Sequence, residues 1–210
     1  MVRVTLIVLG SLFLAGSSAK AQEMTPLFDG KTLTGWTGVG GREGNWVVEN
    51  GLLITRGEGG GWLSSKEVYG DFHVSLEYKL QPGGNSGLFI RSPHEGDPAY
   101  TGMEIQILDD EDARYAQLMP YQYCGSVYGV EAAKRGHTKP AGQWNQMEVI
   151  AQGTHIQVRL NGATVVDTDL NNHKDAVTSH PGIERHEGYI GLQSHSEPVE
   201  FRNIKIKPLK

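Results

Sequence analysis

Apolar and polar residues alternate with a period of two along much of this chain, and this restricts its fold more than any other feature. The segment from Asp71 to Leu80 shows it best, because every second side chain from Phe72 onward is apolar. Successive side chains of a strand point to opposite faces of a sheet, so the pattern predicts a half-buried β-strand. Helical periodicity is hard to find.

Turn residues separate the alternating segments. Asn50-Gly51 lies between two short β-like runs, and Asn161-Gly162 lies between two others. Asn-Gly between alternating segments is a strong hairpin signal. Strands are therefore expected at 46–48, 52–55, 71–80, 85–91, 102–109, 144–151, 155–160, 164–167, 188–194 and 199–207. So many short strands favour an all-β, two-sheet antiparallel sandwich.

Two stretches carry no clear pattern, namely residues 111–135, which are rich in Tyr, and residues 171–187. Long loops in a compact domain often serve as lids or binding loops.

The first 21 residues have the pattern of a signal peptide. Arg3 gives a basic start, Val4 to Ala15 is mostly apolar, and Ala19-Lys20-Ala21 fits cleavage before Gln22. The apolar run is short for a membrane span, although an uncleaved anchor is the alternative. No cysteine follows it, which excludes the lipoprotein route. We expect a single domain at 22–210, exported to the periplasm or beyond the cell.

The net charge restricts the classes of binding partner, and the cysteine count restricts disulfide bonding. Cleavage removes Arg3 and Lys20, so that 24 acidic residues face 17 basic ones. This excess argues against nucleic acid or an anionic membrane as a partner. Cys124 is the only cysteine, so an internal disulfide is impossible, and a small core residue is a better interpretation than a nucleophile.

The expected strands carry an unusual set of polar residues on the faces opposite their apolar ones. If the strands are neighbours in one sheet, a single concave surface gathers Glu77, Arg91, Glu104, Gln106, Gln193 and His195. Such groups offer paired donors and acceptors to sugar hydroxyls, and Phe89, Tyr100, Tyr123 and Tyr128 offer rings for stacking. The alternative is the solvated face of an ordinary sheet.

Two clusters suggest metals without the spacing that metals require. The acidic run Asp109 to Asp112 lacks a calcium-loop pattern, so a solvated turn is preferred. His173, His180 and His186 match no zinc spacing, so scattered loop histidines are preferred. No metal or cofactor is predicted, and dependence on a divalent cation stays open.

Several short motifs together resemble the DUF1080 family, also called the 3-keto-disaccharide hydrolase domain. They are Leu27-Phe-Asp-Gly-Lys-Thr-Leu-Thr-Gly-Trp36, Gly70-Asp-Phe72, Asn85-Ser-Gly-Leu-Phe-Ile-Arg91, Gly102-Met-Glu-Ile-Gln-Ile-Leu-Asp109, Trp144-Asn145, Asn161-Gly162, Gly188-Tyr-Ile-Gly-Leu-Gln-Ser-His195 and Val199-Glu-Phe-Arg-Asn-Ile204. The resemblance covers about Thr25 to Lys207. One departure is Ser196, where the family usually has glycine after the histidine.

The resemblance implies a concanavalin- or laminin-G-like jelly roll and an exported enzyme acting on glycosides oxidised at carbon 3. A 3-keto group acidifies the hydrogen on carbon 2, so a base can remove it and the aglycone can leave by elimination before water adds. We assign Glu104 as the base, Arg91 as the enolate stabiliser and His195 as the acid or ligand orienter. The substrate-binding set is Glu77 (a reserve carboxylate), Phe89, Gln106, Gln193 and Tyr128.

Two other functions stay open at this stage. A jelly roll can be a carbohydrate-binding module without catalysis, because a fold does not fix a function. A conventional glycoside hydrolase needs two carboxylates at a fixed separation, and Glu77 with Glu104 are the candidates. The sequence indicates no oligomeric state.

Overall fold

The computed structural model describes residues 23–57 and 59–210, so the expected signal peptide lies outside the described residues. The strands are β1 (Thr25–Pro26), β2 (Trp36–Val39), β3 (Trp46–Glu49), β4 (Leu52–Thr55), β5 (Trp62–Tyr69), β6 (Phe72–Leu80), β7 (Asn85–Ser92), β8 (Met103–Leu108), β9 (Trp144–Gln152), β10 (His155–Leu160), β11 (Ala163–Asp169), β12 (Gly188–Gln193) and β13 (Val199–Pro208). The helices are α1 (Pro98–Thr101) and the 3₁₀ turns η1 (Ala113–Tyr115), η2 (Pro120–Gln122), η3 (Leu170–Ala176) and η4 (Pro181–Glu184).

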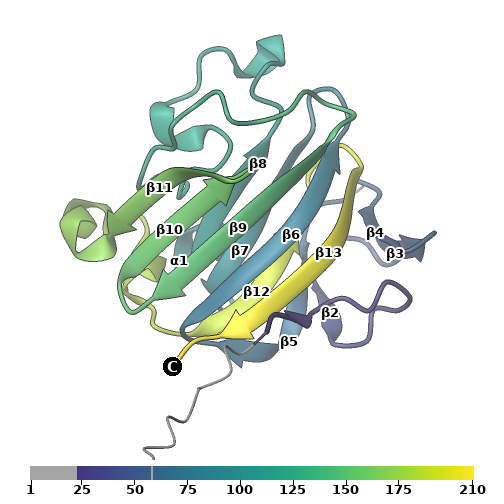
Figure 1. Cartoon of the computed structure of the whole chain (residues 1–210), viewed down its shortest axis with the longest axis horizontal. Helices are drawn as coiled ribbons and strands as arrows, with labels where there is room; N and C mark the ends of the chain where they lie inside the picture. Colours follow the sequence, from purple (N-terminus) through teal and green to yellow (C-terminus); the bar gives the residue numbers. More distant parts are fainter. Residues whose placement is uncertain (1–22, 58) are drawn as a thin grey trace, which may run out of the picture.

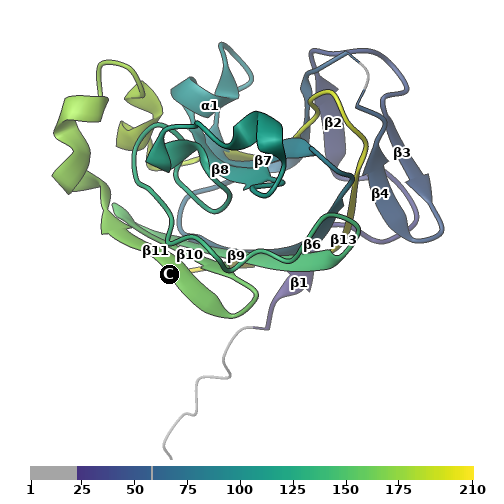
Figure 2. The ribbon, with the colours of Figure 1, turned by 90° about the horizontal axis from the view of Figure 1, so that it is seen from above.

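Two antiparallel sheets pack face to face, as Figures 1 and 2 show, which confirms the expected all-β jelly-roll sandwich. The larger sheet has the order β11-β10-β9-β6-β13-β4-β3, with β1 paired to β13. The smaller sheet has the order β2-β5-β12-β7-β8. In Figure 2, α1 lies on the side of the smaller sheet that faces away from the larger one. Within the described part of the chain, no helix is long and apolar enough to cross a bilayer.

The alternating segments build the core as expected. Every second side chain of β6, from Phe72 to Leu80, is buried, and Leu88 and Ile90 of β7 join the same core. Burial of apolar area at roughly 25 cal/mol per Å² is the main stabilising contribution. Cys124 also lies in this core, with its Sγ 3.2 Å from the Tyr78 hydroxyl oxygen. Burial raises the pKa of its thiol to about 12, which suits a packing residue and not a nucleophile.

Both Asn-Gly pairs form the predicted hairpin turns. Asn50 and Gly51 have φ of 52° and 80° between β3 and β4, and Asn161 and Gly162 have φ of 49° and 87° between β10 and β11. Positive φ at both central residues matches the right-handed twist of the flanking strands, and Asn and Gly reach it at low cost.

The pattern missed β1, β2 and β5, of which β5 matters most because it borders the site described below. Its middle is polar, yet Ser64 and Ser65 are fully buried. Their hydroxyls are satisfied inside the sheet, since Ser64 donates to the Ser65 carbonyl at 2.9 Å and Ser65 accepts from the Ile190 N–H at 3.0 Å. Local hydrogen bonds therefore allow a polar segment to occupy a buried strand.

Candidate active site

A small polar pocket of about 160 Å³ opens on the outer face of the smaller sheet. The strand register places its side chains there, because Gly87 of β7 pairs with Gln106 of β8, and Phe89 pairs with Glu104. The α1 segment and the turn after β12 close the sides. The lining residues are Asn85, Asp97, Ala99, Tyr100, Glu104, Gln106, Tyr128, Gln193 and His195.

Glu104 is the buried carboxyl of this pocket, with only 3% of the residue exposed. Its side chain lies over Gly87, where an added Cβ would collide with the carboxylate oxygen Oε1. Burial, together with the negative charge of Asp97, raises the pKa of the Glu104 carboxyl to about 8. A carboxylate with this proton affinity is a stronger base than an ordinary one.

We expect Gly87→Ala to reduce turnover without unfolding the protein. The backbone of Gly87 needs no positive φ, but the added methyl group would displace the Glu104 carboxylate. A displacement of about 1 Å in a catalytic group can cost about 100-fold in rate. Steady-state kcat/KM and the melting temperature should be measured together. An unchanged kcat/KM would mean that the carboxylate position over Gly87 does not matter.

The amides of the pocket present both donors and acceptors. Oε1 of Gln106 accepts from the backbone N–H of Ile107 at 3.1 Å, which leaves the NH₂ group of Gln106 as a donor. Oδ1 of Asn85 and Oε1 of Gln193 are buried and have no hydrogen-bond partner among residues 23–57 and 59–210. Buried acceptors without partners are costly, so both are ready to accept hydroxyl protons from a ligand.

The α1 segment forms one wall. Its N-cap, Asp97, accepts from the Ala99 N–H at 3.0 Å, which fixes the start of the segment. Tyr100 follows, with its ring edge-on to Tyr128 at 6.4 Å between centroids and tilted against His180 at 4.9 Å. Tyr100, one of the rings that the sequence offers for stacking, lines the pocket, whereas Asp97 is a wall residue that sequence reasoning missed because it lies between strands.

His195 stands exposed at the rim, on the turn after β12. A buried network holds the base of this turn, since the Ser194 hydroxyl accepts from Asn45 Nδ2 at 2.6 Å and from Thr55 Oγ1 at 2.7 Å. Ser196, at the position where the sequence departs from the family pattern, places its hydroxyl 3.0 Å from His195 Nδ1. The departure therefore adds a contact to the imidazole.

Arg91 does not reach this pocket, and the expectation that it shares a surface with Glu104 is wrong. Its backbone has a φ of 49°, which breaks the strand alternation at the end of β7. The buried guanidinium turns to the loops at that end, donating to the carbonyl of Gly70 at 3.0 Å and of Gly153 at 2.7 Å, and pairing with Asp71 at 3.1 Å. We therefore assign Arg91 a structural role.

Glu77 is also elsewhere, because β6 belongs to the larger sheet. Its carboxylate accepts from Arg202 Nε at 2.8 Å and from Asn203 Nδ2 at 2.7 Å. Partial burial raises its pKa, but the bonds from Asn203 and Arg202 outweigh burial and lower it overall. Glu77 and Glu104 cannot act as a glycosidase pair, since they lie on different sheets.

The remaining aromatic candidates divide. Tyr128 lines the pocket as expected, whereas Phe89 is buried beside Glu104, its cross-strand partner, and does not line the pocket. The Phe89 ring packs against Trp62 at 5.5 Å in an edge-to-face geometry and belongs to the same buried cluster as Ala99. Its ring is therefore not exposed for stacking on a ligand. Tyr123 stacks under the Arg135 guanidinium at 3.7 Å.

The acidic run after β8 is only in part the solvated turn that the sequence predicts. Asp112 accepts from the nearby Arg114 N–H at 3.0 Å, whereas Asp109 accepts from the distant Gly83 N–H at 2.8 Å and the buried Asp110 from the Cys124 N–H at 2.9 Å. In the portion of the chain that the structure describes, no group of three His, Cys, Asp or Glu residues is arranged to hold a metal ion.

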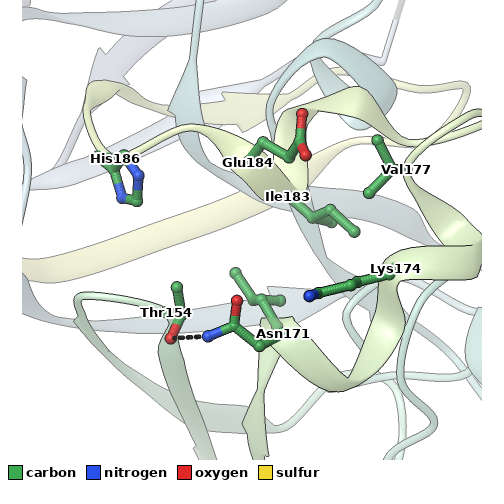
Figure 3. Close-up of a pocket in the computed structure, with 8 residues that line it drawn as sticks. Thr154, Asn171, Lys174, Val177, Ile183, Glu184 and His186 are labelled. Carbon is green, nitrogen blue, oxygen red and sulfur yellow. Dashed lines mark hydrogen bonds between the residues drawn. The ribbon is translucent and has the colours of Figure 1, made fainter.

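A larger cavity of about 450 Å³ lies between η3, η4 and the β9–β10 turn (Figure 3). Its apolar lining residues are Leu170, Val177 and Ile183. Its polar lining residues are the half-buried Thr154 and the exposed Asn171, Lys174, Glu184 and His186. Asn171 Nδ2 donates to Thr154 Oγ1 at 3.1 Å. The cavity contains no buried carboxyl, so we place the candidate chemistry in the smaller pocket.

The fold and the pocket define a jelly-roll sandwich with an ionisable polar site on the outer face of its smaller sheet. The chain belongs to the 3-keto-alpha-glucoside-1,2-lyase-like domain family, whose model matches residues 23–207.

Relatives agree with this assignment. A 3-keto-disaccharide hydrolase of Bacteroides thetaiotaomicron is 28% identical over 87% of this chain and 77% of its own length. A crystal structure from Parabacteroides distasonis, provisionally described as a glycosyl hydrolase, is 31% identical with a TM-score of 0.79, covering 89% of this chain and all of the other. A Bacillus subtilis protein with a galectin-like fold, 15% identical with a TM-score of 0.58 over 83% of this chain and 89% of its own, shares the fold alone.

Proposed function

We propose that this protein is an exported enzyme that cleaves 3-keto-glycosides by removing the proton on carbon 2, eliminating the aglycone and hydrating the product. The observation that carries the proposal is the buried Glu104 carboxyl, which faces a polar pocket and has a pKa of about 8. Export rests on the signal-peptide pattern of residues 1–21, and the 3-keto substrate class on the family and its named relative.

The residues of the pocket divide the work. Glu104 takes the proton from carbon 2, which the neighbouring keto group has made acidic. The amide oxygen of Gln106 already accepts from the Ile107 N–H, so the NH₂ group of Gln106 donates to the enolate oxygen. Gln106 thus replaces Arg91 as the enolate stabiliser. Asn85 and Gln193 accept protons from sugar hydroxyls, and His195 orients the ligand at the rim.

The two alternative functions lose support at this site. A non-catalytic module has no use for a buried carboxyl with a raised pKa, whose burial costs stability. A conventional hydrolase would need a second catalytic carboxylate. The other one lining the pocket, Asp97, is engaged as the N-cap of α1.

The test is incubation of the protein with a glucoside and with its 3-keto counterpart, followed by measurement of the released aglycone. Release from the keto sugar alone supports the proposal. Release from the unoxidised glucoside would indicate a conventional hydrolase, and binding without release would indicate a carbohydrate-binding module.

The pH dependence of kcat/KM gives a separate prediction. Glu104 must lose its proton before it can act as the base, so activity should rise with pH and level off above about 8, the pKa of this carboxyl. Below this value the rate should fall about tenfold per pH unit. A rising limb centred near pH 4 to 5, the range of an ordinary carboxyl, would contradict the role of Glu104 in its buried state.

A further inference from the structure

The elimination needs an acid that protonates the departing glycosidic oxygen. The hydroxyl of Tyr128 is a candidate, because the hydrogen bonds around it leave its proton free. Tyr128 lines the pocket with Glu104, and the backbone N–H of Tyr128 donates to the Glu104 carbonyl at 2.9 Å. The two side chains are therefore held on neighbouring backbones at the same opening.

The direction of the bond to the Tyr128 hydroxyl is fixed by Gln122. Oε1 of Gln122 accepts from the backbone N–H of Met119 at 3.0 Å, and a backbone N–H can only donate. The Gln122 amide is thereby oriented, so that Nε2 donates to the Tyr128 hydroxyl oxygen at 2.8 Å. The phenolic proton of Tyr128 is not used in this bond.

The neighbouring phenol, Tyr100, lies edge-on to Tyr128, with 6.4 Å between the two ring centroids. Among residues 23–57 and 59–210, the hydrogen bond of the Tyr128 hydroxyl is the one from Gln122, in which the hydroxyl oxygen accepts. The phenolic proton of Tyr128 therefore remains available to a ligand.

We propose that Tyr128, oriented by Gln122, is the catalytic acid that protonates the glycosidic oxygen of the departing aglycone. Glu104 takes the proton from carbon 2, and the electron pair of that C–H bond moves onto the keto group to give an enolate. The enolate then returns the pair to form the C1–C2 double bond while the bond from carbon 1 to oxygen breaks. The phenolic proton moves to the leaving oxygen, which leaves Tyr128 as a phenolate.

Hydration restores both residues. Water adds its oxygen to carbon 1 and gives a proton to the Tyr128 phenolate, while Glu104 returns its proton to carbon 2. The sum is 3-keto-glycoside plus water giving free 3-keto sugar plus free aglycone, with no oxidant or reductant needed. Tyr128 is a catalytic residue in this scheme, and Gln122 is a positioning residue that acts through it.

The inference rests on the proposed function, and leaving-group dependence tests it separately. Methyl 3-keto-glucoside has a poor leaving group that needs a proton, whereas the nitrophenyl counterpart does not. We expect Tyr128→Phe to lower kcat/KM about 100-fold on the methyl substrate and less than about fivefold on the nitrophenyl one. Equal losses on both substrates would overturn the role of Tyr128 as the acid.

Gln122→Glu is the matched test of orientation. A carboxylate there would still accept from Met119 but would also accept the Tyr128 proton, turning it away from the pocket. It should reproduce the leaving-group-dependent loss, and a loss that is equal on both substrates would contradict the positioning role. Tyr115→Phe removes a tyrosine hydroxyl that bonds the Gly83 carbonyl outside the pocket, and should leave both rates unchanged.

Hydrogen exchange separates failure of this inference from failure of the proposed function. In D₂O, Tyr128→Phe should still exchange the hydrogen on carbon 2 of methyl 3-keto-glucoside, because Glu104 is intact, while releasing little methanol. Loss of exchange together with release would overturn the assignment of Tyr128 to the leaving group. If the unmodified protein releases aglycone from neither keto sugar, the proposed function and this inference both fail.

Discussion

Replacement of Glu104 by Gln should lower turnover of a 3-keto-glucoside by about 100-fold or more, because the amide cannot accept the proton from carbon 2. The side chain keeps its size, so the pocket and its hydroxyl-binding amides should persist. Substrate binding, measured by titration calorimetry, should change little. Near-normal turnover would reject Glu104 as the base.

The stability of the same variant checks that the substitution acts on a buried ionisable group. The pKa of Glu104 is about 8 in the folded protein, against a usual value of 4.5. A raised carboxyl pKa means that stability is present in full below about pH 4.5 and declines as pH rises toward 8. Gln avoids this decline. The variant should therefore melt close to the wild type at pH 5 and several degrees above it at pH 9.

Replacement of Arg91 by Met should destabilise the fold and leave the chemistry nearly intact. The guanidinium holds the carbonyls of Gly70 and Gly153 and the carboxylate of Asp71, and only 1% of the residue is exposed. Removing it takes this donor from both carbonyls and the cation from Asp71, which still accepts from the Gly153 N–H at 2.9 Å. The expected cost is about 3 kcal/mol. The melting temperature should fall by about 10 °C in a protein of this size.

The matched control is Arg202→Met, which removes the half-exposed partner of Glu77 on the larger sheet. Loss of this surface ion pair in Arg202→Met should lower the free energy of unfolding by about 1 kcal/mol or less.

The activity of Arg91→Met is measured at a temperature where this variant is folded. The kcat/KM of Arg91→Met should then lie within about threefold of the wild type. A loss near 100-fold under those conditions would return Arg91 to the catalytic machinery.

The sequence predicted the sandwich well because local chemistry carried most of the information. Alternation fixed which side chains of β6 face the core, and the Asn-Gly pairs fixed two hairpins through their tolerance of positive φ. It failed at β5, where Ser64 and Ser65 are buried with hydroxyls satisfied inside the sheet. A buried polar residue whose hydroxyl is hydrogen-bonded inside the protein looks like a surface residue in the sequence, so the alternation of apolar and polar residues does not reveal such a strand.

The site was predicted in part for a related reason. Glu104 and Gln106 share a face of β8, which a period of two can predict. Gln193 of β12 lines the same pocket although the pairing of β12 with β7 shifts register between Tyr189 and Gly191. Arg91 escaped the pattern because one positive φ at the end of β7 redirects its side chain. Asp97 and Tyr100 lie between strands, where alternation assigns no face.

The sequence by itself determined ten of the thirteen strands, two hairpin turns, the faces of the regular strands and the family. Only the tertiary structure decided which strands are neighbours. That decision separates Glu77 from Glu104, brings Tyr128 and α1 to the pocket, and buries Glu104 over Gly87. The physical reason is the sequence separation of the interactions involved. Propensity and periodicity depend on residues a few positions apart, whereas sheet order and the burial of a carboxyl depend on contacts between distant segments.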